Sequence, residues 1–162
     1  MKKKLPNLAA ALMLMLVLAG CGGKPIMNER AENDEVISAG DVSGASSVYT
    51  LAQWVESDRV KSAEDTINAY SDFTGMRAEF DAEGDDILII NCFYVKQLNL
   101  DGLDQEELET YFSSALSDIS STMDPLFTTC QEATDVKLQC VRVNYVNADG
   151  TMVYTYDFPN TK

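Results

Sequence analysis

The spacing of apolar residues predicts two amphipathic helices in the later part of the chain. Apolar side chains recur every three or four positions over residues 51–70 and again over residues 108–119, which is the period of a helix with one buried face. Thr50 and Gln53 have the spacing of a capping box, which would start the first helix. The pattern weakens at Ser57, so we expect a break there.

Alternation between apolar and polar residues predicts a β-hairpin after the first helix. Residues 76–81 alternate, the polar stretch 83–85 contains a glycine and forms the turn, and residues 86–95 return as the second strand. The returning strand is apolar on both faces for most of its length, which indicates a central position in a sheet.

A second hairpin is predicted at the end of the chain. Its strands cover residues 136–146 and 151–158, and the turn between them contains Asp149-Gly150, a strong hairpin signal. The alternation of the first strand shifts phase near Cys140, which indicates a β-bulge. The last strand is expected to place four large residues on one face: Met152, Tyr154, Tyr156 and Phe158.

These elements predict one α+β domain over residues 49–162. The order helix–hairpin–helix–hairpin favours a four-stranded antiparallel sheet with both helices on one face. The segment is long enough for one domain.

The start of the chain has the three parts of an export signal. Residues 2–4 are lysines, the 12 residues 8–19 are apolar, and small residues precede Cys21. A helix needs about 20 apolar residues to span a bilayer. We therefore expect residues 1–20 to be a cleaved signal peptide rather than a permanent anchor.

The site Leu18-Ala19-Gly20-Cys21 resembles the lipobox of bacterial lipoproteins. The resemblance implies that the thiol of Cys21 receives a diacylglyceryl group and that cleavage makes this cysteine the new N-terminus. Two acyl chains hold a protein stably on a bilayer, whereas one chain binds only marginally. We expect a lipid anchor in the cell membrane, with the domain on the extracytoplasmic face. The alternative is a secreted protein in which Cys21 has no role.

Residues 21–48 are expected to be the lipidated cysteine followed by a flexible linker. Glycine, serine and acidic residues dominate this segment, and it has no sustained apolar period. Such a composition cannot bury enough apolar surface to offset the entropy of ordering. The 27 residues 22–48 would span on the order of 25–30 Å as a flexible coil.

Charge and composition exclude several classes of function. The chain has 12 basic and 26 acidic residues; removing residues 1–20 takes away three lysines, which leaves 9 basic residues and a net charge of −17. This charge opposes nucleic-acid binding, which needs a basic surface. The absence of histidine excludes serine–histidine and cysteine–histidine catalysis within this chain, and histidine-containing zinc sites. We expect no cofactor.

Two acidic segments contain enough carboxylates to suggest calcium binding, at residues 81–86 and 99–109. The first is also a polar hairpin turn, and the second does not fit the glycine position of an EF-hand loop. We expect a metal at neither. Glycoside hydrolysis needs a carboxylate pair with one raised pKa. Every acid of this chain lies in a polar stretch, so we expect no enzymatic activity.

Three cysteines remain after Cys21, and they leave two alternatives. Exported proteins meet oxidising conditions, so a disulfide is one option: Cys130–Cys140 would close a short loop, and Cys92–Cys140 would join two predicted strands. The other option is that all three are small buried side chains.

Basic residues in the predicted strands suggest a binding surface. If the second face of the sheet is open, it would be a less acidic platform on which a partner strand or peptide docks, there or at a sheet edge. The alternative is a plain solvated face. The candidate binding residues are Arg77, Lys137, Gln139 and Arg142.

Three short motifs carry a second resemblance: Tyr49-Thr50-Leu51, Gly75-Met76 and Asn147-Ala148-Asp149-Gly150-Thr151. With the order of elements, they resemble a family of small uncharacterised domains in Gram-positive surface lipoproteins, over roughly residues 48–158. The resemblance implies no catalytic residues. We expect a non-enzymatic binding or accessory module whose partner is an envelope protein or peptide. The alternatives are a small-ligand receptor with a pocket between helices and sheet, and, less favoured, a cell-wall hydrolase.

Overall fold

In a computed structural model, which describes residues 49–117 and 120–161, the first predicted helix is divided into three. These are α2 (Leu51–Val55), α3 (Asp58–Asn68) and α4 (Ser71–Thr74). Thr50 and Gln53 form the predicted capping box at the start of α2. The predicted break is also confirmed, because the side chain of Ser57 caps α3. Gly75 ends α4 with a φ of 75°, a conformation that favours glycine.

The second helical region contains α5 (Gln105–Ser117), a 3₁₀ helix η2 (Ser120–Met123) and α6 (Asp124–Thr134). Asp104 and Glu107 cap the start of α5 reciprocally, each side chain accepting a hydrogen bond from the other's backbone N–H. Pro125 lies in the first turn of α6, where the missing N–H breaks no helical hydrogen bond.

The sheet has four strands in the order β1-β2-β3-β4 and is mostly antiparallel. The strands are β1 (Met76–Glu83), β2 (Ile87–Tyr94), β3 (Cys140–Val146) and β4 (Met152–Pro159). The expectation of a fully antiparallel sheet is wrong at its centre, because β2 and β3 are parallel. The chain leaves one end of β2 and returns through α5, η2 and α6 to the other end, and parallel neighbours require such a crossover.

The bulge lies in a different place from the one predicted. Tyr145 pairs with Tyr154 and Val146 pairs with Met152, so the extra residue is Val153 on β4 and not a residue near Cys140. Because of this shift, Met152 does not share a face with Tyr154, and its side chain is 53% exposed.

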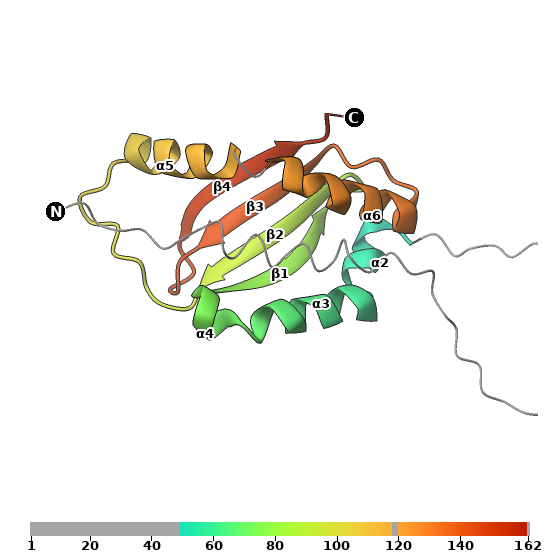
Figure 1. The fold of residues 1–162 in the computed structure, drawn as a ribbon, viewed down its shortest axis with the longest axis horizontal. Coiled ribbons are helices and arrows are strands. Elements are labelled where there is room, and N and C mark those ends of the chain that lie inside the picture. The colour runs from blue at the N-terminus through green and yellow to red at the C-terminus, as the bar shows by residue number, and fades with distance from the viewer. Residues whose placement is uncertain (1–48, 118–119, 162) are drawn as a thin grey trace, which may run out of the picture.

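One face of the sheet, which we call the inner face, forms the core with the helices. Alternate strand residues such as Ala78, Ile90 and Val143 belong to one apolar cluster, and every buried apolar residue of α2, α3, α5 and α6 belongs to the same cluster. Figure 1 shows α2, α3 and α4 along the β1 side of the sheet and α5 beside β4. The described residues therefore contain five α-helices where two were expected.

The three cysteines of the described residues are buried free thiols, so the disulfide that we considered is not formed. Cys92 lies on the inner face and pairs with Tyr145 on β3. Cys140 precedes Tyr145 by five residues, an odd number, so it lies on the opposite face. Cys130 is on α6, with its sulfur 3.9 Å from the hydroxyl of Thr134.

The predicted signal peptide, the lipobox cysteine Cys21 and the linker lie outside the described residues. Within residues 49–117 and 120–161, none of the helices has both the length and the apolar run needed to cross a bilayer.

Candidate binding surface

The face of the sheet opposite the core, which we call the outer face, has no helix packed on it within the described residues. The buried apolar residues of the helices all belong to the inner-face cluster. Four outer-face residues of the central strand β2 are only half-buried: Ile87, Ile89, Asn91 and Phe93. An apolar row therefore runs along the middle of an uncovered sheet.

Carboxylates lie on both sides of this apolar row, directly beside it on β1 and beyond β3 on β4. On β1, Glu79, Asp81 and Glu83 alternate with the buried residues and are exposed, and Asp157 is exposed on β4. The face also carries two guanidinium groups, from Arg77 and Arg142, so its net charge is negative. Arg77 and Arg142, two of the expected binding residues, therefore lie among exposed carboxylates on this face.

Arg142 on β3 is held by two carboxylates, Asp157 on the neighbouring strand β4 and Glu83 on β1, two strands away. Its Nε and Nη2 donate to the two carboxylate oxygens of Asp157 at 2.8 and 3.1 Å, and its Nη1 donates to Glu83 at 2.7 Å. The hydrogen bond to Asp157 is the main cause that raises the pKa of Arg142 above its ordinary value. This geometry is bidentate on Asp157, so the positive charge of Arg142 is satisfied within the face.

A row of polar side chains lies next to Arg142 and extends across β2, β3 and β4. Asn144 donates to Asn91 at 2.9 Å, and the hydroxyl of Thr155 donates to Asn144 at 2.9 Å. Such cross-strand pairs hold side chains in place. The polar part of the outer face is therefore ordered before any partner arrives.

The four predicted binding residues do not form one cluster. Arg77 is exposed and shares a row with Phe93 at one end of the sheet. Lys137 is exposed but precedes β3, and Gln139 lies just before the row of Ile87, at the other end. Seven strand residues of about 3.3 Å each place these ends roughly 23 Å apart.

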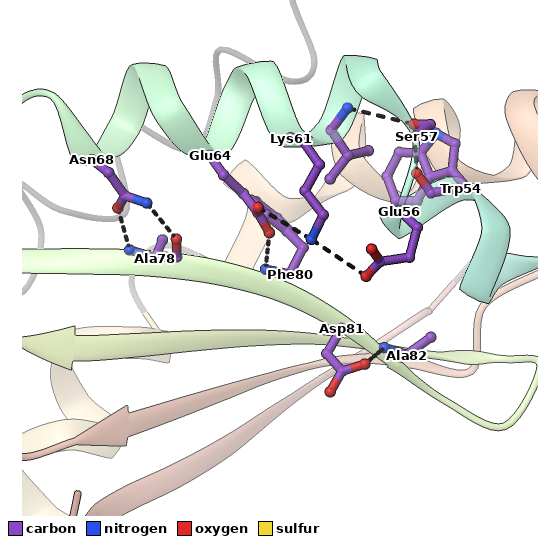
Figure 2. A network of polar contacts seen from close by, with 11 residues as sticks. Trp54, Glu56, Ser57, Lys61, Glu64, Asn68, Ala78, Phe80, Asp81 and Ala82 are labelled. Carbon is purple, nitrogen blue, oxygen red and sulfur yellow. Dashed lines mark hydrogen bonds and ion pairs between the residues drawn. The ribbon is translucent and has the colours of Figure 1, made fainter.

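The edge of β1 is covered by polar side chains of α3 (Figure 2). Asn68 accepts a hydrogen bond from the N–H of Ala78 at 2.8 Å and donates to its carbonyl at 3.0 Å. The buried carboxylate of Glu64 accepts from the N–H of Phe80 at 2.6 Å. These contacts satisfy backbone groups that an exposed edge strand would offer to another chain.

A polar groove of about 390 Å³ runs between α3 and β1. Lys61 lies between Glu56 and Glu64, with Nζ–O distances of 3.4 and 3.3 Å. Burial lowers the pKa of Lys61, but the two carboxylates outweigh this effect and raise it. The groove reaches the outer face through three shared residues, Glu79, Asp81 and Asn91. The lining residues are Glu56, Lys61, Glu64, Asp65, Asn68, Glu79, Phe80, Asp81 and Asn91.

Sequence reasoning missed the apolar row of β2 and the carboxylate of Glu64. Both left a signal: β2 is apolar on both faces although the expected helices cover only one, and Glu64 lies on the same helical stripe as Val60 and Ile67. An acid within an apolar stripe indicates a buried partner.

No group of three or more acidic or thiol side chains in the described residues is arranged to hold a metal ion. Burial raises the pKa of the thiols of Cys92 to about 12 and of Cys130 to about 11. A thiol with a raised pKa is a poor nucleophile at neutral pH.

Comparison with known proteins identifies the domain but assigns it no activity. Searches of curated proteins and of solved structures find no match to the chain. One family model, described as a domain of unknown function (DUF4854), matches residues 51–158. This match confirms that the folded part is an uncharacterised domain, and the chain belongs to the DUF4854 family.

Proposed function

We propose that the chain is a lipid-anchored, extracytoplasmic, non-enzymatic module that binds a protein or peptide on the outer face of its sheet. The observation that carries the proposal is the uncovered apolar row of Ile87, Ile89 and Phe93, bordered by ordered charged and polar side chains. Protein interfaces have this arrangement, with an apolar centre and a polar rim.

The chemistry of the chain supports binding rather than catalysis. The full sequence has no histidine, and the thiols of Cys92, Cys130 and Cys140 are buried. The one cation of the groove, Lys61, is paired with carboxylates. Buried thiols and a paired lysine are poor candidates for catalysis, which favours a binding role.

The anchor rests on the sequence around Cys21 and has its own test. Mass spectrometry of the chain from its native membrane should find Cys21 as the N-terminal residue, carrying a diacylglyceryl group. Cys21→Ser should move the protein from the membrane fraction to the soluble fraction. An unmodified Cys21, or membrane retention of the serine variant, would refute the anchor.

Binding on the outer face can be tested by photo-crosslinking on intact cells. A benzoylphenylalanine replaces Thr155 on the outer face or, as a matched control, Thr66 on the exposed side of α3; both threonines are exposed. We expect a discrete protein adduct from position 155 and none from position 66. Equal adducts from both positions, or none from position 155, would refute an outer-face binding module.

A small-ligand receptor is the second candidate, because the groove has the volume of a ligand site. Its five carboxylates outnumber its one lysine, so a cationic ligand would fit it best. Thermal unfolding with spermidine tests this idea. A spermidine-induced rise in the midpoint of thermal unfolding that Glu79→Gln abolishes would favour the receptor. No rise would exclude a receptor for cationic ligands.

A further inference from the structure

The two edges of the sheet differ in how their backbone groups are covered. At the β1 edge, side chains of Asn68 and Glu64 on α3 bond the backbone of the strand. At the β4 edge, α5 packs on the inner face, where the ring of Phe112 stacks on Tyr154 with centroids 4.7 Å apart. Within the described part of the chain, no side chain bonds the backbone of β4 from outside the sheet. The β4 edge is therefore open to another strand.

The backbone groups of Thr155 and Asp157 point away from the sheet at this open edge. The N–H of Asn160 donates to the carbonyl of Gln139 at 2.9 Å, and this pair continues the register of β4 with β3. Residues that bond the neighbouring strand alternate with residues whose backbone groups point away. Counting back from Asn160 places Asp157 and Thr155 in the outward set. Pro159 belongs to the same set, where its missing N–H removes no hydrogen bond of the sheet.

The sequence of β4 is self-complementary about Thr155. In an antiparallel pair of two β4 strands centred on this residue, Thr155 lies opposite its own counterpart, and Tyr154 lies opposite Tyr156 of the other copy. Threonine pairs and aromatic pairs in these positions stabilise strand pairing, and both tyrosines are only half-buried in the single chain. Asp157 lies opposite Val153, so no like charges meet. An axis at Asp157 would instead place two carboxylates directly opposite each other.

We propose that two copies of the chain pair through β4 in an antiparallel, twofold-symmetric contact centred on Thr155. The N–H and carbonyl groups of Thr155 bond the same groups of the other copy, and two four-stranded sheets become one continuous sheet. The twofold axis is perpendicular to the sheet, so both outer faces lie on the same side. This inference goes beyond the proposed function, because the pairing doubles the outer face and leaves the apolar row of β2 uncovered.

The covered β1 edge limits the assembly to two copies. Head-to-tail pairing of β4 with β1 would build an open filament, but Asn68 and Glu64 already bond the β1 backbone. An extended segment of another protein has access to the same β4 edge. Such a segment would have to supply the partners of Tyr154 and Tyr156, which a second copy presents by symmetry. The sequence of β4 therefore favours a second copy.

Disulfide trapping on intact cells tests the dimer. Thr155→Cys in the full chain places two thiols beside the axis, where opposite Cα atoms lie about 5.5 Å apart, a distance that a disulfide spans. Thr151→Cys is the matched control, because its two copies would lie roughly 26 Å apart along the paired strands. With diamide as the oxidant, we expect a disulfide-linked chain dimer from position 155 and none from position 151 or from the native chain. No dimer from position 155, or equal dimers from positions 155 and 151, would overturn the proposal.

Amide hydrogen exchange on the purified full-length chain separates a stable contact from random collision. The N–H of Thr155 has no partner in a single chain, so protection at this position reports the pairing. Thr155→Glu would place two carboxylates directly opposite each other, whereas Thr66→Glu adds the same charge on α3. We expect the protection factor at position 155 to fall at least tenfold in Thr155→Glu and to be retained in Thr66→Glu, with the Ala78 amide of β1 unchanged in both. An unprotected Thr155 amide in the native chain would overturn the dimer.

Failure of the dimer and failure of the proposed function give different results. In the photo-crosslinking experiment at position 155, an adduct of the chain with itself has twice the mass of the chain, whereas a partner adduct has another mass. A chain dimer without a partner adduct would leave the β4 pairing intact and remove the proposed function. A partner adduct without disulfide trapping would remove only the dimer.

Discussion

Replacement of Asn68 by alanine should uncover the edge of β1. The side chain of Asn68 makes both hydrogen bonds to Ala78, at 2.8 and 3.0 Å, from the last residue of α3. Alanine keeps the helix but removes the donor and the acceptor together. The variant therefore isolates the contribution of this contact to the stability of the sheet.

The expected loss of stability follows from the two hydrogen bonds that are removed and from the higher helix propensity of alanine, which partly compensates. Each hydrogen bond contributes about 0.5–1.5 kcal/mol net, and Asn68 is half-buried, so water would replace part of the loss. The higher helix propensity of alanine offsets up to about 0.7 kcal/mol. We expect the free energy of unfolding to fall by about 1–2 kcal/mol, a factor of roughly 5–30 in the folded-to-unfolded ratio.

Urea unfolding and amide hydrogen exchange should be measured together. Thr66→Ala is the matched control, because Thr66 is exposed on the same helix and bonds only within it. In Asn68→Ala the amide of Ala78 should exchange roughly 5–30-fold faster. If Asn68→Ala unfolds like Thr66→Ala and the Ala78 amide keeps its protection, then α3 does not cover the β1 edge.

Three further predictions follow from other parts of the fold. Gly75→Ala should cost about 1 kcal/mol in urea unfolding, because φ is 75° there and no atom lies near the added methyl; unchanged stability would contradict this. Cys92 and Cys130 have pKa values raised to about 12 and about 11. The unfolded thiols ionise from about pH 8.5 while the folded ones stay protonated, so stability should fall as pH rises from about 9 to 12; a flat alkaline profile would argue against their burial. Arg142→Met should destabilise by about 1 kcal/mol, less at high salt because its partners are half exposed; a salt-independent loss would indicate packing instead.

The parts of the fold that the sequence predicted are those set by local contacts. The capping box of Thr50 and Gln53 and the break at Ser57 each depend on residues within a few positions. The direction of β3 relative to β2 does not depend on such local contacts, because the same alternation of side chains is compatible with parallel and antiparallel pairing. That direction depends on where α5 and α6 return the chain, which is a property of tertiary packing.

Part of the outer face could be predicted from the sequence. The acids of β1 alternate with Met76, Ala78 and Phe80, so their position on the face of Arg77 follows from the two-residue period. The pairing of Arg142 with Glu83 joins residues 59 positions apart. No local pattern in the sequence reveals that pairing. Arg142 was therefore expected to be available for binding, whereas carboxylates neutralise its charge in the fold.

Thiol footprinting on intact cells tests outer-face binding most directly. The native thiols of the described residues are buried, so Thr155→Cys and Thr66→Cys each add one reactive site to a chain whose Cys21 is expected to be lipidated. A membrane-impermeant maleimide should label position 66 equally fast on cells and in purified protein, and position 155 several-fold more slowly on cells. Equal rates at position 155 in both settings would contradict outer-face binding, and no labelling of position 66 on cells would contradict display outside the membrane.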